Sequence, residues 1–244
     1  MTIQNANVFV TGANRGIGRA LVEQLLERGA GTIYAAARNT DSVSDLVALD
    51  PERVKSVQLD ITNREQVDAA AGTASDATIL INNAGVLAVD GIVEGDLELM
   101  RRDMETNYFG TANMVQAFAP VIESNGGGSI ANVLSVVSLA PMPMIGGYSA
   151  SKAAAFSLTQ TARAELRDRK IAVHGVYPGP VDTDMTDGFE MEKATPQGVA
   201  REILDGIDAG AEDIFPDAMA AQVGTTWQAE PKNLERQFAG AAAH

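Results

Sequence analysis

The residue types best suited to proton-transfer chemistry are Tyr148 and Lys152, which stand four positions apart. At the start of a helix, this spacing places both side chains on one face. A free tyrosine has a pKa of about 10, which is too high for efficient acid–base work at neutral pH, and a nearby ammonium group lowers it. The pair therefore predicts a device that moves a proton on or off a carbonyl oxygen. A surface tyrosine beside a solvated lysine would show the same spacing.

A serine is the second candidate for this chemistry. Ser135 closes a strand-like segment upstream of Tyr148, and its hydroxyl is placed to hold a substrate oxygen beside the tyrosine. Ser138 is the alternative. No convincing Ser–His–Asp arrangement exists, because His174 lies in an apolar strand and is typical of a core histidine.

A glycine-rich segment follows the first strand-like run. It has the pattern G-x-x-x-G-x-G, and its residues are Gly12, Ala13, Asn14, Arg15, Gly16, Ile17 and Gly18. Glycines allow a tight turn and a close approach of backbone to a diphosphate, and the N-terminus of the next helix attracts that anion. The spacing differs from the common G-x-G-x-x-G fingerprint, so the position after the first strand carries the prediction of a dinucleotide site.

The residues after the second strand indicate which dinucleotide. Enzymes that use NAD place an acid there for the ribose 2′-hydroxyl, whereas here Arg38 follows the strand and the nearest acid is Asp41. Arg38, with Arg15 in the glycine loop, suits a 2′-phosphate and predicts NADP(H). The alternative is that both arginines are solvated surface residues. Asp60 is a candidate for the adenine amino group or, equally, a helix-entry carboxylate.

These residues must be positioned by alternating strands and helices, which the apolar periodicity predicts. We expect strands over about 6–11, 32–37, 54–59, 78–82, 129–134, 171–177 and 212–215, and helices between them. The region 97–123 is expected to be helical with one break, and Thr62 with Glu65 predicts a capping box. The pattern indicates an α/β fold with three layers, in which about seven strands form a doubly wound parallel sheet. One domain is expected over 1–244, with a cofactor half to about 135 and a catalytic and substrate half after it.

Composition excludes several classes of function. The chain has 244 residues, a net charge of −14 and no cysteine. Nucleic acid is disfavoured as a partner because phosphates would be repelled. No metal site is expected, since His174 and His244 supply the chain's imidazoles. No signal peptide and no membrane-spanning run is recognised, which makes a cytoplasmic protein the expectation.

Taken together, the motifs resemble the short-chain dehydrogenase/reductase family in its compact single-domain branch. The matching elements occur in family order as TGANRGIG (11–18), LD (59–60), NNAG (82–85), Asn107, Ser135, Tyr148 with Lys152, and PGPVDT (178–183). The resemblance implies a Rossmann-type fold in which Tyr148 acts as the acid in reduction. It also implies that Lys152 binds the nicotinamide ribose, that Ser135 polarises the carbonyl and that Asn107 supports a water.

The resemblance also implies the residues that contact cofactor and substrate. Cofactor contacts are expected at Gly12, Asn14, Arg15, Gly16, Ile17, Gly18, Arg38, Asp60, Ile61, Asn83, Ala84, Gly85, Tyr148, Lys152, Pro178, Gly179, Val181 and Thr183. The substrate wall is expected at Val86, Leu87, Ser135, Pro141, Met142, Met144, Tyr148, Met185, Phe189 and Met191. Methionines adapt to irregular apolar ligands, which favours a neutral apolar or aromatic ketone or aldehyde, although ordinary packing would use them equally.

The chain departs from the family's pattern near its C-terminus. The region 212–217 reads EDIFPD and precedes a helical tail, which puts the usual tetramer in doubt and favours a homodimer through the long helices. Ala150, Ala153, Ala154 and Ala155 would permit close helix approach there. Two other functions remain open: a non-catalytic NADP-binding regulator on the same fold, and a 3-oxoacyl reductase within the family. An epimerase with the same Tyr–Lys pair would need a larger substrate domain.

Overall fold

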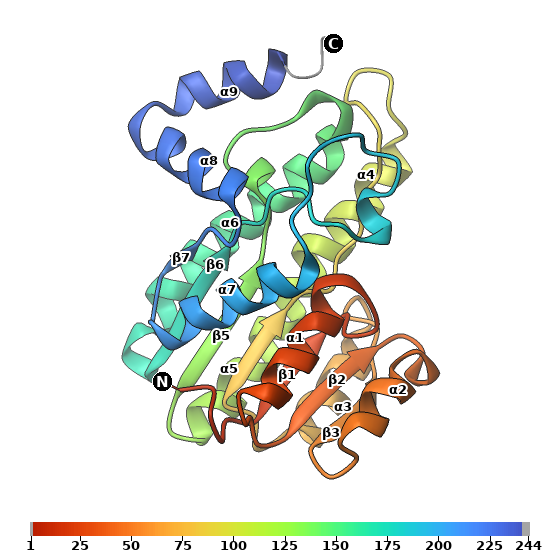
Figure 1. Cartoon of the computed structure of the whole chain (residues 1–244), viewed down its shortest axis with the longest axis vertical. Helices are drawn as coiled ribbons and strands as arrows, with labels where there is room; N and C mark the ends of the chain where they lie inside the picture. Colours follow the sequence, from red (N-terminus) through yellow and green to blue (C-terminus); the bar gives the residue numbers. More distant parts are fainter. Residues whose placement is uncertain (1, 241–244) are drawn as a thin grey trace.

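The computed structural model describes residues 2–240 and contains one parallel sheet of seven strands in the order β3-β2-β1-β4-β5-β6-β7 (Figure 1). The strands are β1 (Val8–Thr11), β2 (Ile33–Ala37), β3 (Val54–Gln58), β4 (Ile79–Asn82), β5 (Gly128–Val133), β6 (Ile171–Val176) and β7 (Asp213–Ile214). Every neighbouring pair is parallel. The expected doubly wound sheet is confirmed.

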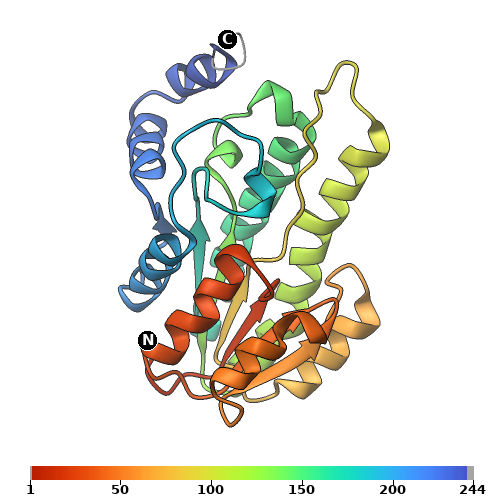
Figure 2. The same cartoon turned by 45° about the vertical axis from the view of Figure 1, so that its right-hand side comes forward.

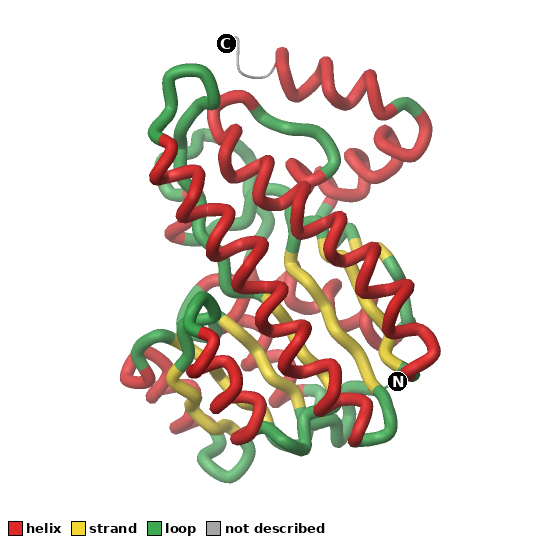
Figure 3. Tube along the Cα trace, turned by 180° about the vertical axis from the view of Figure 1, so that it is seen from behind, coloured by secondary structure: helices red, strands yellow, loops and turns green. Residues whose placement is uncertain are grey.

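Helices cover both faces of this sheet (Figure 3). They are α1 (Gly16–Glu27), α2 (Ser44–Leu49), α3 (Arg64–Thr73), α4 (Leu97–Met104), α5 (Thr111–Ser124), α6 (Gly146–Leu166), α7 (Pro196–Asp208), α8 (Ala218–Ala229) and α9 (Pro231–Gly240). In β1, Val8 and Val10 belong to the apolar cluster with α1 and α7, whereas Phe9 packs on Phe118 of α5 with ring centroids 4.6 Å apart. Both faces of the central strands are therefore buried, as in other parallel sheets.

The long helical region 97–123 is interrupted once, as expected. A π-helical turn over Glu105–Gly110 separates α4 from α5, and Asn107 lies inside it. The Thr111 hydroxyl donates to the Asn107 carbonyl oxygen at 2.8 Å. Such turns are rare and occur often at functional sites.

Two helix starts differ from the sequence prediction. The capping box at Thr62 is wrong: α3 begins at Arg64, the Asn63 side chain accepts from the Gln66 N–H at 3.1 Å, and the Thr62 hydroxyl donates to the Asp60 carboxylate at 2.7 Å. The Thr62 hydroxyl bonds to the Asp60 carboxylate and is therefore not available to cap the helix, so Asn63 takes that role. Helix α6 begins at Gly146, two residues before Tyr148.

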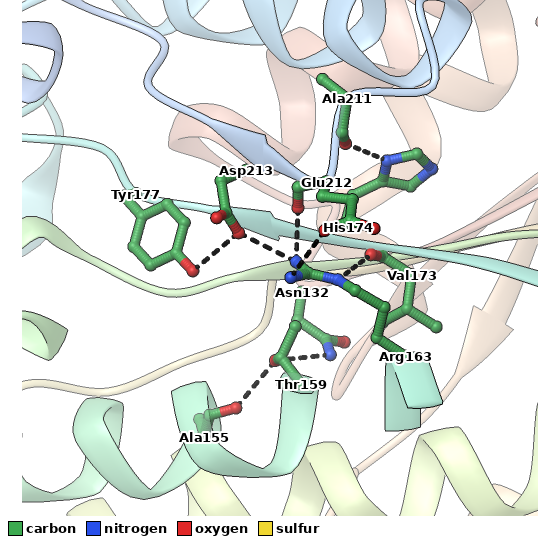
Figure 4. Close-up of polar contacts among 10 residues, drawn as sticks. All are labelled: Asn132, Ala155, Thr159, Arg163, Val173, His174, Tyr177, Ala211, Glu212 and Asp213. Atoms are coloured by element: carbon green, nitrogen blue, oxygen red, sulfur yellow. Dashed lines mark hydrogen bonds and ion pairs between the residues drawn. The ribbon is translucent and has the colours of Figure 1, made fainter. Parts of the chain in front are cut away.

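A polar network ties α6 to the last two strands of the sheet. Figure 4 shows Arg163 of α6 reaching the Val173 and Glu212 carbonyl oxygens and the Asp213 carboxylate, at 3.0, 2.6 and 2.9 Å. Tyr177 also donates to Asp213, at 3.1 Å. The network fixes the helix that carries Tyr148 and Lys152 relative to β6 and β7.

The loops that follow β4, β5 and β6 gather at one end of the sheet, together with α8 and α9 (Figure 2). Leu234 and Phe238 of α9 belong to one buried cluster with Val137, Ile145 and Tyr148. The C-terminal helices therefore cover the segment that precedes and opens α6. No helix within residues 2–240 has the length and apolarity needed to cross a bilayer.

Candidate active site

A cavity of about 840 Å³ opens at the carboxyl ends of the strands. The glycine loop, the ends of β2 and β3 and the segments after β4, β5 and β6 all contribute to its lining. This is the place where doubly wound sheets bind ligands. Of the predicted cofactor residues, all but Gly18 line it.

The glycine loop is shaped for close approach of a ligand to the backbone. Gly12 and Gly16 have φ of +64° and +53°, which disfavours any other residue. A Cβ on Gly12 would lie 2.9 Å from the Ala84 Cα, and one on Gly18 would lie 2.1 Å from the Gly12 carbonyl oxygen. Gly18 thus serves the packing of α1 against the turn, outside the cavity lining.

Asn83 holds this loop in place. Its side-chain amide donates to the carbonyl oxygens of Thr11 and Gly12 at 3.0 and 3.1 Å, and its backbone N–H donates to the Thr11 hydroxyl at 2.9 Å. Asn83 therefore both braces β1 against β4 and lines the cavity. The curved loop, with the N-terminus of α1 behind it, fits a diphosphate.

Two arginines stand at the outer end of the cavity. Arg38 follows β2 and is exposed. Arg15 forms an ion pair with Asp184, at 2.7 Å, and both residues line the cavity. Asp60 accepts from the Thr62 N–H and hydroxyl at 3.0 and 2.7 Å, so its helix-entry role is present in addition to its place in the lining. The region offers positive donors and no carboxylate at the end of β2.

Tyr148 and Lys152 are buried at the inner end, 7 % and 5 % exposed. The Lys152 Nζ donates to the Val133 carbonyl oxygen at 2.8 Å and lies 5.8 Å from the Tyr148 ring centroid. Ser135, two residues after the end of β5, lines the same space, and its hydroxyl accepts from the Val137 N–H at 3.3 Å. The Ser138 hydroxyl accepts from the Ser135 N–H at 3.2 Å and is not part of the lining, so the geometry favours Ser135.

Burial dominates the titration of this pair. It raises the pKa of Tyr148 to about 12, with hydrogen bonding by Ser135 lowering it and the charge of Asp103 raising it. Burial lowers the pKa of Lys152 to about 8, while Asp103 raises it. The expected lowering of the phenol pKa by Lys152 is not seen in the protein alone, because the apolar surroundings penalise the phenolate more strongly.

Asn107 lies behind the cavity wall and is not part of the lining. Its side chain both accepts from the Val86 N–H at 2.9 Å and donates to the Val86 carbonyl oxygen at 2.8 Å. It also donates to the Ser151 hydroxyl at 2.9 Å, which in turn donates to the Tyr148 carbonyl oxygen at 2.7 Å. The side chain thus links the segment after β4 to the start of α6.

The predicted substrate wall is mostly brought together. Val86, Leu87, Met142, Met144, Met185, Phe189 and Met191 line the cavity with Ser135 and Tyr148. Pro141 was also expected in this wall, but it is exposed and lies outside the lining. Sequence reasoning missed Val137, Ile145, Thr186, Glu190 and Met219. Met219 belongs to α8, and no motif places that helix over the cavity.

His174 takes no part in this site. His174 Nδ1 lies 2.6 Å from the Ala211 carbonyl oxygen and Nε2 lies 3.2 Å from the Ser129 hydroxyl, as expected for a core histidine. His244 lies outside the described residues. Within 2–240, no group of three or more histidine, aspartate or glutamate side chains could hold a metal ion.

A model of short chain dehydrogenases matches residues 6–194. The chain belongs to this family. It is 32 % identical over 203 residues to an uncharacterised oxidoreductase of Staphylococcus aureus, covering 80 % of this chain and 87 % of that one. A short chain dehydrogenase from Burkholderia cenocepacia, solved in complex with NADP, is 42 % identical with a TM-score of 0.92, covering 98 % of this chain and 99 % of that one. One from Streptomyces avermitilis is 26 % identical with a TM-score of 0.84, covering 95 % and 97 %. The chain is an oxidoreductase of this family.

Proposed function

We propose that this protein reduces ketones or aldehydes to alcohols with NADPH, and that it can run the reaction in reverse as an alcohol dehydrogenase. The proposal rests on one observation: Ser135, Tyr148 and Lys152 line the inner end of the same cavity that the glycine loop lines. This is the arrangement needed for proton transfer beside a bound dinucleotide.

The choice of NADPH over NADH rests on Arg15 and Arg38, which line the cavity and carry donors suited to a 2′-phosphate. The Burkholderia relative, solved with NADP, supports it. Bound NADPH would supply the hydride. The protein's own contribution is to bind the diphosphate at Gly12–Gly18 and to keep the reacting end of the cavity apolar.

The proton steps belong to three side chains. The Tyr148 phenol gives its proton to the carbonyl oxygen, and the Ser135 hydroxyl, oriented by the Val137 N–H, binds that oxygen as charge develops. The Lys152 ammonium, held by the Val133 carbonyl, stabilises the phenolate that is left. Asn107 anchors the Val86 wall, and any water relay would start from this side of the site.

The substrate is a neutral apolar or aromatic carbonyl compound. Methionine, phenylalanine and aliphatic side chains form the wall, and the acids near it are Asp184 and Glu190. A substrate carboxylate or an acidic carrier protein would be repelled by these groups and by the net charge of −14. This favours small carbonyl compounds over carrier-bound 3-oxoacyl groups.

A homodimer through α5 and α6 remains part of the proposal. A shallow groove between these helices is lined by Tyr108, Val115, Ala154 and Leu158, among others. Ala150, Ala153 and Ala154 lie on accessible positions of α6, but Ala155 is 1 % exposed and packs inside the chain. Only the first three alanines can therefore serve helix approach between subunits.

The test is oxidation of NADPH and of NADH, followed by absorbance, across aromatic, aliphatic, cyclic and 3-oxoester carbonyls, with identification of the alcohol formed. We expect NADPH-dependent turnover, fastest with apolar and aromatic substrates. Tight NADPH binding without turnover of any of these compounds would favour the non-catalytic regulator. Preference for 3-oxoesters would favour the acyl reductase.

A further inference from the structure

Asp103 is the most unusual charged residue near the site. It lies on α4, is fully buried at 0 % exposure, and stands four residues before Asn107 on the same helix face. Burying a carboxylate is costly unless its oxygens are paired. Asp103 is not part of the cavity lining and belongs to none of the family motifs named above.

Its partners explain where it acts. One oxygen accepts from the Ala88 N–H at 3.0 Å, and the other pairs with the Arg102 guanidinium at 3.1 Å. Asn107 holds both polar backbone groups of Val86. Two side chains from one helix face thus fasten alternate residues of the segment 86–88, whose Val86 and Leu87 form part of the cavity wall.

The same helix approaches the start of α6. A Cβ on Gly147 would lie 2.9 Å from the Met100 Cγ, so α4 and α6 are in close contact one residue before Tyr148. Asp103 is 0 % exposed, and Tyr148 and Lys152 are 7 % and 5 % exposed. Coulomb interactions between buried groups act over longer distances than those at the surface.

We propose that Asp103 is a positioning residue of this active site, which fastens the 86–88 wall through Ala88 and supplies the negative charge that keeps buried Lys152 in its ammonium form. The proposal rests on the proposed function, in which that ammonium supports the Tyr148 phenolate. Asp103 raises the pKa of Lys152 and also that of Tyr148. Removing its charge should therefore lower both.

Other charges near the pair are accounted for. Arg102, half-exposed on α4, partly offsets the Asp103 charge. The remaining ionisable residues of the cavity lining are Arg15, Arg38, Asp60, Asp184 and Glu190. None of these five is a cause of the pKa shifts of Tyr148 or Lys152, for which Asp103 is the charged contributor.

The experiment compares Asp103→Asn with Glu105→Gln. The amide keeps an acceptor for the Ala88 N–H while removing the charge, and Glu105 is an exposed acid two positions away. The readout is the pH profile of kcat/KM for alcohol oxidation with NADP⁺, whose limbs report the coupled pair. We expect both limbs to move to lower pH by about half a unit or more in Asp103→Asn and to stay in place in Glu105→Gln.

A second readout is independent of turnover. Ultraviolet titration of Tyr148, taken as the difference between each protein and its Tyr148→Phe counterpart, should show the same downward shift in Asp103→Asn. Wild type that turns over no carbonyl compound would defeat the proposed function, and the titration would still decide the role of Asp103.

The contrary results are clear. An unchanged profile and titration in Asp103→Asn, or equal shifts in both variants, would overturn the proposal. Asp103→Ser, which is smaller and retains an acceptor, is the second variant if the amide does not fold, and it should shift in the same direction. Failure of both variants to fold would assign Asp103 a purely structural role and also overturn it.

Discussion

At the scale of single residues, Tyr148 and Lys152 respond to burial in opposite directions. The phenol is held neutral, with a pKa of about 12, and the lysine is drawn toward its neutral form, with a pKa of about 8. A charge placed near them therefore changes the balance of both groups at once. This is the physical reason why a fully buried carboxylate on α4 bears on the proton chemistry.

The buried lysine makes stability depend on pH. Its pKa of about 8, against an ordinary 10.5, means that the cost of burying the charge is full below pH 8 and disappears as pH rises toward about 10.5. A shift of this size corresponds to a net cost of about 3 kcal/mol. Lys152→Met should therefore be more stable than wild type near pH 7, with an advantage that shrinks between about pH 8 and 10.5.

The measurement is the free energy of unfolding in denaturant across that pH range. Lys55→Met, at an exposed position of β3, is the control and should show no such trend. An advantage of Lys152→Met that is constant with pH would contradict the burial argument.

The arginine at the end of β2 should decide which dinucleotide binds well. Removing a guanidinium from a phosphate costs about 1.5–3 kcal/mol, or roughly 10- to 100-fold in Kd. Arg38→Ala should weaken NADPH by that factor and leave NADH nearly unchanged, measured by fluorescence titration. Arg64→Ala, outside the cavity and paired with Asp68, is the control. Equal losses for both nucleotides would remove the 2′-phosphate assignment.

The sequence located most of these residues because each follows a strand end or stands at a fixed spacing. Residues whose role depends on packing between distant elements could not be predicted from spacing or motifs. Asp103 belongs to no motif, and its burial depends on how α4 crosses the start of α6. Pro141 was misplaced because the turn after β5 directs Val137 and Met142 into the cavity and leaves the proline in solvent.

At the scale of elements, periodicity predicted every strand of the sheet to within a few residues, since buried parallel strands are short apolar runs bounded by turns. The break in the 97–123 helix was expected, but its π-helical form depends on the contacts of Asn107 with Val86 and Ser151, which lie far along the chain. The wrong cap at Thr62 has a similar cause, because Asp60 competes for the threonine hydroxyl.

The anchoring of α6 by Arg163 provides a test at this scale. Arg163→Met leaves the Glu212 carbonyl and the Asp213 carboxylate without their cation and should lower the free energy of unfolding by about 2–3 kcal/mol. Arg169→Met is the matched control, because its pair with Glu123 lies at the surface and contributes less than about 1 kcal/mol. Equal losses in the two variants would contradict the anchoring role drawn in Figure 4.

At the scale of the whole molecule, the C-terminal helices close over the catalytic segment. The sequence predicts a helical tail but not what the tail covers, because Leu234 and Phe238 meet their partners only in the folded chain. Met219 reaches the cavity lining for the same reason. The tail thus contributes to the substrate end of the site.

Phe238 tests this arrangement. Phe238→Ala removes a buried ring from the cluster that contains Tyr148 and should lower the free energy of unfolding by about 3–5 kcal/mol. Where the variant still folds, kcat should fall more than NADPH affinity does, because the glycine loop lies in the other half of the sheet. Leu49→Ala, at an exposed position, is the control and should change neither quantity. A Phe238→Ala protein with wild-type stability would show that the tail does not pack as described.

Tyr148→Phe tests whether the Tyr148 phenol donates the proton when NADPH reduces a carbonyl compound. The measurement pairs NADPH oxidation on the best carbonyl substrate with the Kd of NADPH for the same protein. We predict that turnover falls by at least about 100-fold, the usual contribution of a general acid, while the Kd changes less than about threefold. Turnover close to that of wild type would contradict the assignment of Tyr148 as the acid.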